Sequence, residues 1–181
     1  MIFYTGDTHF HHDNILKYAK RKFTTVEEMN EQLVERWNAK VGKTDTVIHL
    51  GDVLFGGDDN LKILKRLNGQ KTLILGNHDQ HRPIKTWQQY FGSVHDIKIF
   101  FDPILDRQVA LLHYPMESWP HKYRHAVHLH GHCHGNLERT MVGRMDVGVD
   151  CHPNLEPFSS EEIRDYLISR DGYLTADPTT A

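Results

Sequence analysis

The 181-residue sequence lacks several features that mark particular classes of protein. It has only two cysteines, Cys133 and Cys151, which excludes a disulfide framework and offers no zinc-finger spacing. It has no apolar run long enough to cross a membrane, and no basic stretch leading into one near Met1. We therefore expect a cytoplasmic protein in a reducing compartment, with no membrane partner.

The sequence also has no large excess of charge of either sign. Its 21 basic and 24 acidic residues leave a formal net charge of −3 at pH 7. A protein that binds nucleic acid over a whole face is normally basic, so this balance disfavours that class. No internal repeat or linker divides the chain. We predict a single domain over residues 1–170, followed by a polar C-terminal tail at 171–181.

Histidine, in contrast, is abundant, with 15 copies. Only His11 and His12 are consecutive, which argues against a tag or a chelating tract. Several others stand beside Asp, Asn or Gly at the end of an apolar run. Histidine is the commonest transition-metal ligand, so this clustering indicates metal chemistry.

The first half of the sequence predicts strands that alternate with helices. Apolar runs that stop at or near a glycine predict strands at 2–5, 45–50 and 71–75. Apolar residues at helical spacing predict helices at 26–41 and 60–67. This order is typical of an α/β layout with a parallel sheet.

The second half of the sequence changes character. Further apolar segments predict strands at 93–101, 107–113, 126–130 and 144–150, with little helix between them. Ser159 and Glu162 then resemble a capping box that opens a final helix.

Five short motifs with metal-ligand side chains follow the predicted strands. They read Asp7-Thr8-His9, Gly51-Asp52, Gly76-Asn77-His78-Asp79, His113 alone, and Gly131-His132-Cys133-His134. Loops at the carboxyl ends of strands meet at one edge of an α/β sheet, so these side chains can gather in space. A mixed set of carboxylate, amide and imidazole ligands suits two adjacent divalent ions of Mn, Fe, Zn or Ni. One carboxylate must bridge such a pair, and Asp52 is the candidate bridge.

In their order and residue types, the five motifs resemble the signature of the calcineurin-like metallophosphoesterases. That signature runs Asp-x-His, Gly-Asp, Gly-Asn-His-Asp/Glu, a lone His and Gly-His-x-His, and the chain is most similar to the small stand-alone members from bacteria and phages. The resemblance implies an α/β fold in which a β-sandwich is flanked by helices, a four-layer αββα order. It also implies hydrolysis of phosphate esters.

The resemblance further implies a role for each matched residue. One ion would be held by Asp7, His9, Asp52 and His134, and the other by Asp52, Asn77, His113 and His132. A hydroxide that bridges the two ions would attack phosphorus, while His78 would protonate the leaving oxygen as the general acid. Of the candidate metals, we expect manganese to support activity in vitro.

One departure from the signature concerns the residue that orients the catalytic histidine. In the protein Ser/Thr phosphatases of the family, the Gly-Asp motif is followed by a second Asp in that role. Here Asp52 is followed by Val53 and Leu54, and Phe55 stands where that carboxylate would be. The sequence therefore disfavours a protein phosphatase, and it leaves open what orients His78.

Residues outside the motifs are candidates for substrate contacts. We name Asn14, Arg82, Tyr114 and Arg124. The planar guanidinium of Arg82 could bind a phosphate through two parallel hydrogen bonds. The alternative is that Arg82 is a solvent-exposed arginine of a loop. Asn14 and Arg124 have capping or pairing with neighbours as their alternative roles. The loop at 115–124, which also carries Trp119 and Tyr123, is where we expect selectivity.

Three other functions are weighed against a phosphodiesterase or phosphatase for small or nucleotide-like substrates. A nuclease or RNA-end phosphatase would need a basic, aromatic strip, to which only Lys17, Lys20, Arg21 and Lys22 contribute. A non-catalytic scaffold of the same fold would normally lack a ligand or the catalytic histidine. The metallo-β-lactamase signature His-x-His-x-Asp-His matches from His9 to Asp13 and then fails at Asn14.

Overall fold

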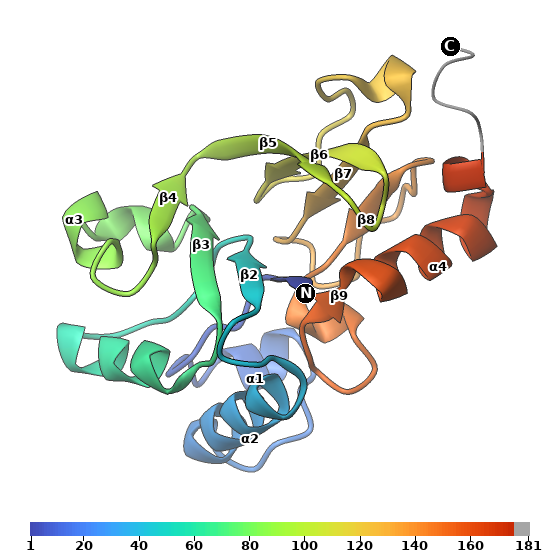
Figure 1. The fold of residues 1–181 in the computed structure, drawn as a ribbon. Coiled ribbons are helices and arrows are strands. Elements are labelled where there is room, and N and C mark those ends of the chain that lie inside the picture. Colours follow the sequence, from blue (N-terminus) through green and yellow to red (C-terminus); the bar gives the residue numbers. More distant parts are fainter. Residues whose placement is uncertain (176–181) are drawn as a thin grey trace.

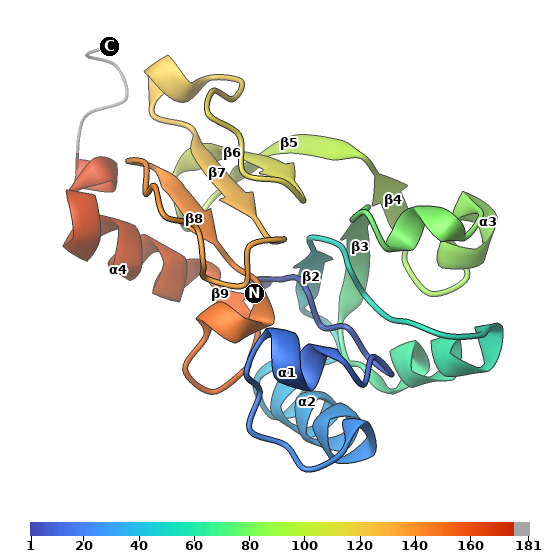
Figure 2. The same ribbon diagram turned by 180° about the vertical axis from the view of Figure 1, so that it is seen from behind.

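Two sheets, each of them mostly parallel, form the framework of the protein (Figures 1 and 2). The computed structural model describes residues 1–175. The first sheet has the strand order β4-β3-β2-β1-β9, and the second has the order β5-β6-β7-β8. The strands are β1 (Ile2–Thr5), β2 (Thr46–His49), β3 (Gln70–Ile74), β4 (Ser93–His95), β5 (Ile97–Asp102), β6 (Arg107–Leu112), β7 (Val127–His130), β8 (Arg144–Asp146) and β9 (Phe158–Ser159). The pairs β1–β9 and β5–β6 are antiparallel, and the other pairs are parallel.

The helices flank these sheets. They are α1 (Ile15–Tyr18), α2 (Val26–Lys40), α3 (Ile84–Trp87) and α4 (Ser160–Asp171), with short 3-10 helices η1 (Asp58–Arg66), η2 (Asp79–His81), η3 (Lys122–Arg124), η4 (Val149–Cys151) and η5 (Tyr173–Thr175). A full capping box of Ser159 and Glu162 opens α4, as predicted. The cap of α2 is only half of such a box. The Thr25 hydroxyl accepts a hydrogen bond from the Glu28 amide at 3.1 Å, but the Glu28 carboxylate accepts one from the Thr24 amide and not from the Thr25 amide.

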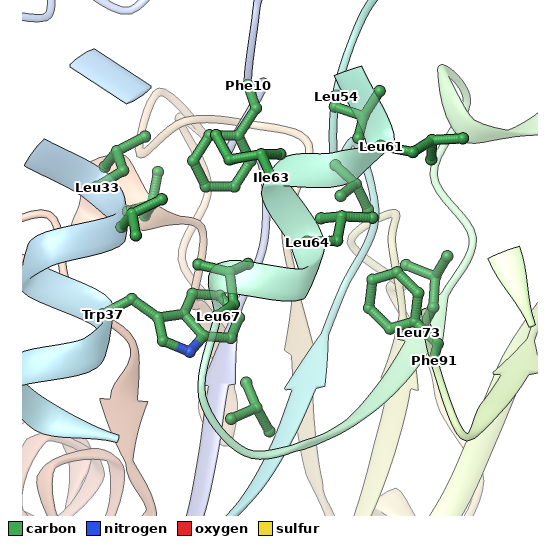
Figure 3. Close-up of a cluster of buried hydrophobic side chains, with 14 of the residues drawn as sticks. Phe10, Leu33, Trp37, Leu54, Leu61, Ile63, Leu64, Leu67, Leu73 and Phe91 are labelled. Carbon is green, nitrogen blue, oxygen red and sulfur yellow. The ribbon is translucent and has the colours of Figure 1, made fainter. Parts of the chain in front are cut away.

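The first sheet is buried on both faces. On one face, its strands pack against α2 and η1 in a cluster that includes Phe10, Leu33, Trp37 and Leu64 (Figure 3). On the other face, its residues share a second cluster with the second sheet and with α4. Burial on both faces explains why the first three strands read as continuous apolar runs rather than alternating ones. The result is a mixed α/β fold of two packed sheets with helices around them.

Three predicted elements differ from the structure. The helix expected at 60–67 is the 3-10 helix η1. The single strand expected at 93–101 is two strands, because the chain leaves the first sheet after His95 and enters the second at Ile97. The strand expected at 144–150 ends at Asp146, whose carboxylate accepts a hydrogen bond from the Gly148 amide at 2.9 Å and turns the chain there.

The structure describes the first part of the segment that the sequence predicts as a C-terminal tail. Within the tail expected at 171–181, residues 173–175 form η5, and the Tyr173 hydroxyl donates to the Ala126 carbonyl at 2.9 Å. Residues 176–181 lie outside the described residues. None of the helices in the described part of the chain is long and apolar enough to cross a membrane.

Candidate metal centre

The five motifs meet where the carboxyl ends of β1, β2, β3, β6 and β7 come together. Within the first sheet, the Asp7 amide donates to the Gly51 carbonyl at 2.9 Å. Between the sheets, the His132 amide donates to the Asp7 carboxylate at 2.9 Å. Parallel neighbours place these loops side by side, as the sequence predicted.

Two groups of side chains at this junction fit a dinuclear metal site. One is formed by Asp7, His9 and His134, the other by Asp52, His113 and His132, and the ligand atoms within each group lie within 4.8 Å of one another. All six residues are among the predicted metal ligands. The seventh, Asn77, has its Oδ1 3.1 Å from His113 Nε2 and so lies beside the second group.

Asp52, a member of the second group, also approaches the first. Its Oδ2 atom is 3.7 Å from His9 Nε2 in the first group and 3.5 Å from His113 Nε2 in the second. This is the position that a carboxylate bridging two ions requires.

His9 provides a test of whether the residues suit a cation. Its side chain is buried, yet neither ring nitrogen has a hydrogen-bond partner among the described residues. A buried polar atom without a partner is costly, and a divalent cation would supply the missing one. Burial also lowers the pKa of His9 to about 2, so the ring is neutral, as a ligand must be. The donors therefore fit divalent ions.

Backbone strain is concentrated in the same turns. Five of the seven predicted ligands have positive φ: Asp7 at 54°, His9 at 48°, Asp52 at 55°, His132 at 70° and His134 at 48°. Residues other than glycine pay for this left-handed conformation, and such strain tends to persist at functional sites. The fold thus holds the ligand side chains in place against their local backbone preferences.

The pKa values of three acidic and basic side chains in the centre are shifted by burial and by the charges close to them. Burial, together with the charges of Asp146 and Asp52, raises the pKa of Asp7 to about 7. Burial alone would lower the pKa of His113, but the nearby Asp52 and Asp7 carboxylates raise it to about 9. For Asp52, burial is outweighed by His113 and by the His78 amide, which lower its pKa to about 2. Asp7 and His113 therefore bind protons where cations would bind.

His78 lies beside the two groups and belongs to neither. Its amide donates to Asp52 Oδ1 at 3.0 Å, its ring Nε2 is 3.9 Å from Asp52 Oδ2, and its side chain is 39% exposed. The Phe55 ring lies 4.7 Å from the His78 ring, centroid to centroid, and stacks on His12 at 3.8 Å. The His78 ring thus packs against an aromatic side chain.

Arg21 and Asp150 support the first group, and neither was predicted. The buried Arg21 guanidinium donates to the carbonyls of Asp7 at 2.6 Å and Thr8 at 2.8 Å, and to both Asp150 oxygens at 2.7 and 2.8 Å. Asp150 Oδ2 in turn accepts from His134 Nδ1 at 2.7 Å, which leaves Nε2 of that ring for a cation. Arg21 lies in a basic run of the sequence, which gives no indication of a role in the centre. Asp150 is a carboxylate at the end of the last predicted strand, and that position could have identified it.

Asp79, the last residue of its motif, organises the turns. Its buried carboxylate accepts hydrogen bonds from the amides of Asp52 at 2.7 Å, Val53 at 3.0 Å and Gly76 at 2.8 Å. It therefore ties the loop after β2 to the loop after β3.

The candidates for substrate contacts are spread around the centre. The Tyr114 ring lies edge-on to the His132 ring, with their centroids 4.7 Å apart, and its residue is 41% exposed. Arg82 lines a hollow of about 290 Å³ beside His78, but its guanidinium already donates to the Gly56 carbonyl. Asn14 precedes α1 and Arg124 ends η3, both on the surface.

The loop at 115–124 is held by a buried side chain. Trp119 is 4% exposed, packs with Ala110 and Ala126, and donates from its indole nitrogen to the Ala126 carbonyl at 2.7 Å. Trp119 therefore has a structural role, and the expectation that it contributes to selectivity is corrected. Tyr123, in the same loop, is 86% exposed.

The chain has relatives among known proteins. No protein-family model matches the sequence. The Gene 66 protein of Mycobacterium phage D29 is 29% identical over 194 aligned positions, which cover 92% of this chain and 95% of that protein. Among solved structures, the protein of unknown function AQ665 from Aquifex aeolicus superimposes with a TM-score of 0.74 at 26% identity, covering 92% of this chain and 98% of that one.

A further relative has a higher sequence identity over a shorter alignment. The uncharacterized protein MJ1445 of Methanocaldococcus jannaschii is 34% identical over 138 residues, which cover 75% of this chain and 70% of that protein. Identity at this level over most of both chains shows common descent. The chain therefore belongs to the same family as MJ1445.

Proposed function

We propose that the protein is a metal-dependent phosphoesterase of the calcineurin-like type, with the four-layer order of helix, sheet, sheet and helix that this type implies. Its substrates are phosphate esters, chiefly phosphodiesters of small or nucleotide-like molecules. The observation that carries the proposal is the position of Asp52 between two groups of ligands, with His78 beside them and in neither group.

The chemistry divides between the cations and the chain. A pair of divalent cations about 3.5–4 Å apart activates water and neutralises charge on phosphoryl oxygens. The chain would hold this pair through the two groups and Asn77, with Asp52 shared. Asp150 and Leu50 fix the ring orientations, because each accepts a hydrogen bond from Nδ1 of His134 or His113, at 2.7 and 2.6 Å, and leaves Nε2 to face the centre.

His78 supplies the proton in this proposal. Its ring is partly exposed and lies next to the bridging carboxylate, so a phosphate ester at the centre would place its leaving oxygen within reach of Nε2. A positioned general acid contributes about 10²–10⁴-fold to the rate. Phe55 limits the movement of the ring by contact rather than by a hydrogen bond.

The activity is tested with the manganese-loaded protein on p-nitrophenyl phosphate and bis-p-nitrophenyl phosphate. We expect hydrolysis, with the diester preferred. His78→Ala should lower turnover by about 10²-fold or more while metal content stays the same. His95→Ala, on β4 and outside both groups, is the control and should keep full activity.

Three outcomes would contradict the proposal. Unchanged turnover in His78→Ala would remove the general acid, and loss of bound metal in that variant would make His78 a ligand. Hydrolysis of neither ester by the metal-loaded protein would favour a non-catalytic scaffold. The nuclease alternative is weakened because Arg21, one of its four cations, is buried against Asp7 and Asp150 and cannot contact a nucleic acid.

A further inference from the structure

The hollow of about 290 Å³ beside His78 is lined by none of the seven candidate metal ligands. Its walls come from the loop after β2, which carries Phe55, and from the turn after β3, which carries His78. Pockets for small molecules span about 300–1,000 Å³, so the hollow lies at the lower end of this range. It has room for one small group rather than for a large molecule.

Two side chains connect the hollow with the candidate metal centre. His78 Nε2 is 3.9 Å from Asp52 Oδ2, and the Phe55 ring lies 5.5 Å from the His9 ring, centroid to centroid. His78 and Phe55 also line the hollow. A substrate bound at the centre can therefore extend past these two rings into the hollow.

The position of His78 decides which part of a substrate the hollow receives. This step rests on the proposed function, in which His78 protonates the leaving oxygen. A general acid lies within about 2.6–3.2 Å of the atom that it protonates, so the leaving group begins next to the His78 ring. Because His78 lines the hollow and the candidate ligands do not, the phosphoryl group belongs at the centre and the leaving group belongs in the hollow.

Phe55 gives the hollow an aromatic wall. Its ring stacks on His12, with the centroids 3.8 Å apart and the planes 14° from parallel, and it is tilted by 48° from the His78 ring. The stack fixes the Phe55 ring, yet the residue is only half-buried and lines the hollow. Aromatic rings pack on one another in offset or edge-on arrangements, so the ring of a ligand can extend this series.

The charged residues of the hollow are engaged with each other and with the wall. Arg82 Nε is 3.6 Å from Asp58 Oδ1, and the Arg82 side chain is 12% exposed. Its guanidinium also donates to the Gly56 carbonyl and lies 5.7 Å from the centre of the Trp87 ring. These contacts hold Arg82 in the wall, and Asp58 offsets its charge. The hollow is therefore better suited to an uncharged ring than to a second phosphate.

We propose that this hollow binds the leaving group of the substrate, and that Phe55 selects leaving alcohols that carry a flat aromatic ring. Nucleosides and aryl alcohols both have this chemistry. The ring packs against Phe55 while the ester oxygen stays beside His78.

Binding of the ring is tested on the metal-free protein in the presence of a chelator, so that metal does not contribute. The leucine methyl groups are labelled with ¹³C, and the protein is titrated with adenosine, phenol and ribose. Adenosine and phenol should shift the Leu54 signal, because Leu54 lines the hollow. Leu129, from the other core cluster, should keep its signal, and ribose, which has no aromatic ring, should shift neither. The affinities of adenosine and phenol show which kind of alcohol the hollow prefers.

Variants of Phe55 assign the wall. Phe55→Leu should weaken adenosine and phenol about tenfold, the usual effect of losing one aromatic stacking contact. Phe55→Tyr keeps a ring at the position and should keep the affinity. Phe101→Leu is the matched control, because it removes a phenylalanine that is 51% exposed on β5 and does not line the hollow.

The assignment to the leaving group has its own measurement, on the manganese-loaded protein. Phenol should inhibit hydrolysis of bis-p-nitrophenyl phosphate competitively, because it occupies the position of the leaving group. Phe55→Leu should raise the inhibition constant of phenol about tenfold, in line with the loss of binding.

An unmoved Leu54 signal with both adenosine and phenol would overturn the proposal, and so would an equal shift with ribose. Equal weakening by Phe55→Leu and Phe101→Leu would show that the Phe55 ring is not the contact. Inhibition by phenol that is not competitive would place the ring away from the leaving group. If the protein hydrolyses neither ester, the titration with chelator still measures the hollow, and only the assignment to the leaving group falls with the proposed function.

Discussion

Two residues of the candidate metal centre bind protons where cations would bind. His113 has a pKa of about 9 and Asp7 a pKa of about 7, both above their ordinary values. A ligand must be deprotonated to bind a metal, so protons and cations compete for these two side chains. Below about pH 7 both carry a proton, and above about pH 9 both are free. Metal affinity should therefore rise with pH across this window.

The competition is measured as protons released on metal binding. Titration calorimetry with zinc in buffers of different ionisation enthalpy should give about two protons from these groups near pH 6 and about one near pH 8. Of these two groups, both contribute to the first value and His113 alone to the second. His134, whose pKa the Asp150 carboxylate raises against the effect of burial, adds to the measured total. Equal proton release at the two pH values, or none at either, would contradict the assignment of raised pKa values to these residues.

At the scale of elements, the strand-to-loop turns position the ligands through close contacts between backbones. A Cβ added at Gly76 would lie 2.5 Å from the Asp52 amide nitrogen, whereas one added at Gly57 would meet nothing within 4 Å. Gly76→Ala should displace Asp52, lower metal affinity by about 10–100-fold and destabilise the fold by about 1–3 kcal/mol. Gly57→Ala is the matched control and should leave both unchanged. Metal titration and urea unfolding measure the two effects, and similar results for both variants would show that the turn tolerates a side chain.

The same elements show how far the sequence predicts this structure. A glycine at the end of an apolar run is a local signal, and it correctly predicts β1, β2 and β3 and the gathering of the ligands around them. The crossing between sheets near Asp96 has no such signal, because the apolar residues continue through it and only pairing with β3 or β6 divides the run. The contact between Arg21 and Asp150 joins positions 129 residues apart, so only the folded chain reveals it.

At the scale of the whole molecule, the candidate metal centre lies where the two sheets meet. Asp7, His9 and Asp52 follow strands of the first sheet, and His113, His132 and His134 follow strands of the second. Besides the cluster of apolar side chains that they share, the sheets are joined by hydrogen bonds, from the His132 amide to Asp7 at the centre and from the Tyr4 hydroxyl to Asp102 between β1 and β5. Cations bound by both sets of ligands would cross-link the sheets. They would stabilise the folded state and not the unfolded state, in which the ligands are far apart.

The expected consequence is a metal-dependent melting temperature. Metal at about 100 times its dissociation constant adds about 2.7 kcal/mol, which is about 5–10 °C for a chain of this size. His9→Ala on the first sheet and His134→Ala on the second should each remove most of the shift, since His9, His134 and Asp7 form one group from both sheets. His95→Ala should retain the full shift, measured by differential scanning calorimetry with and without zinc. A shift that survives in both ligand variants would place the metal elsewhere, and loss in only one of them would mean that the ions bind a single sheet and do not link the two.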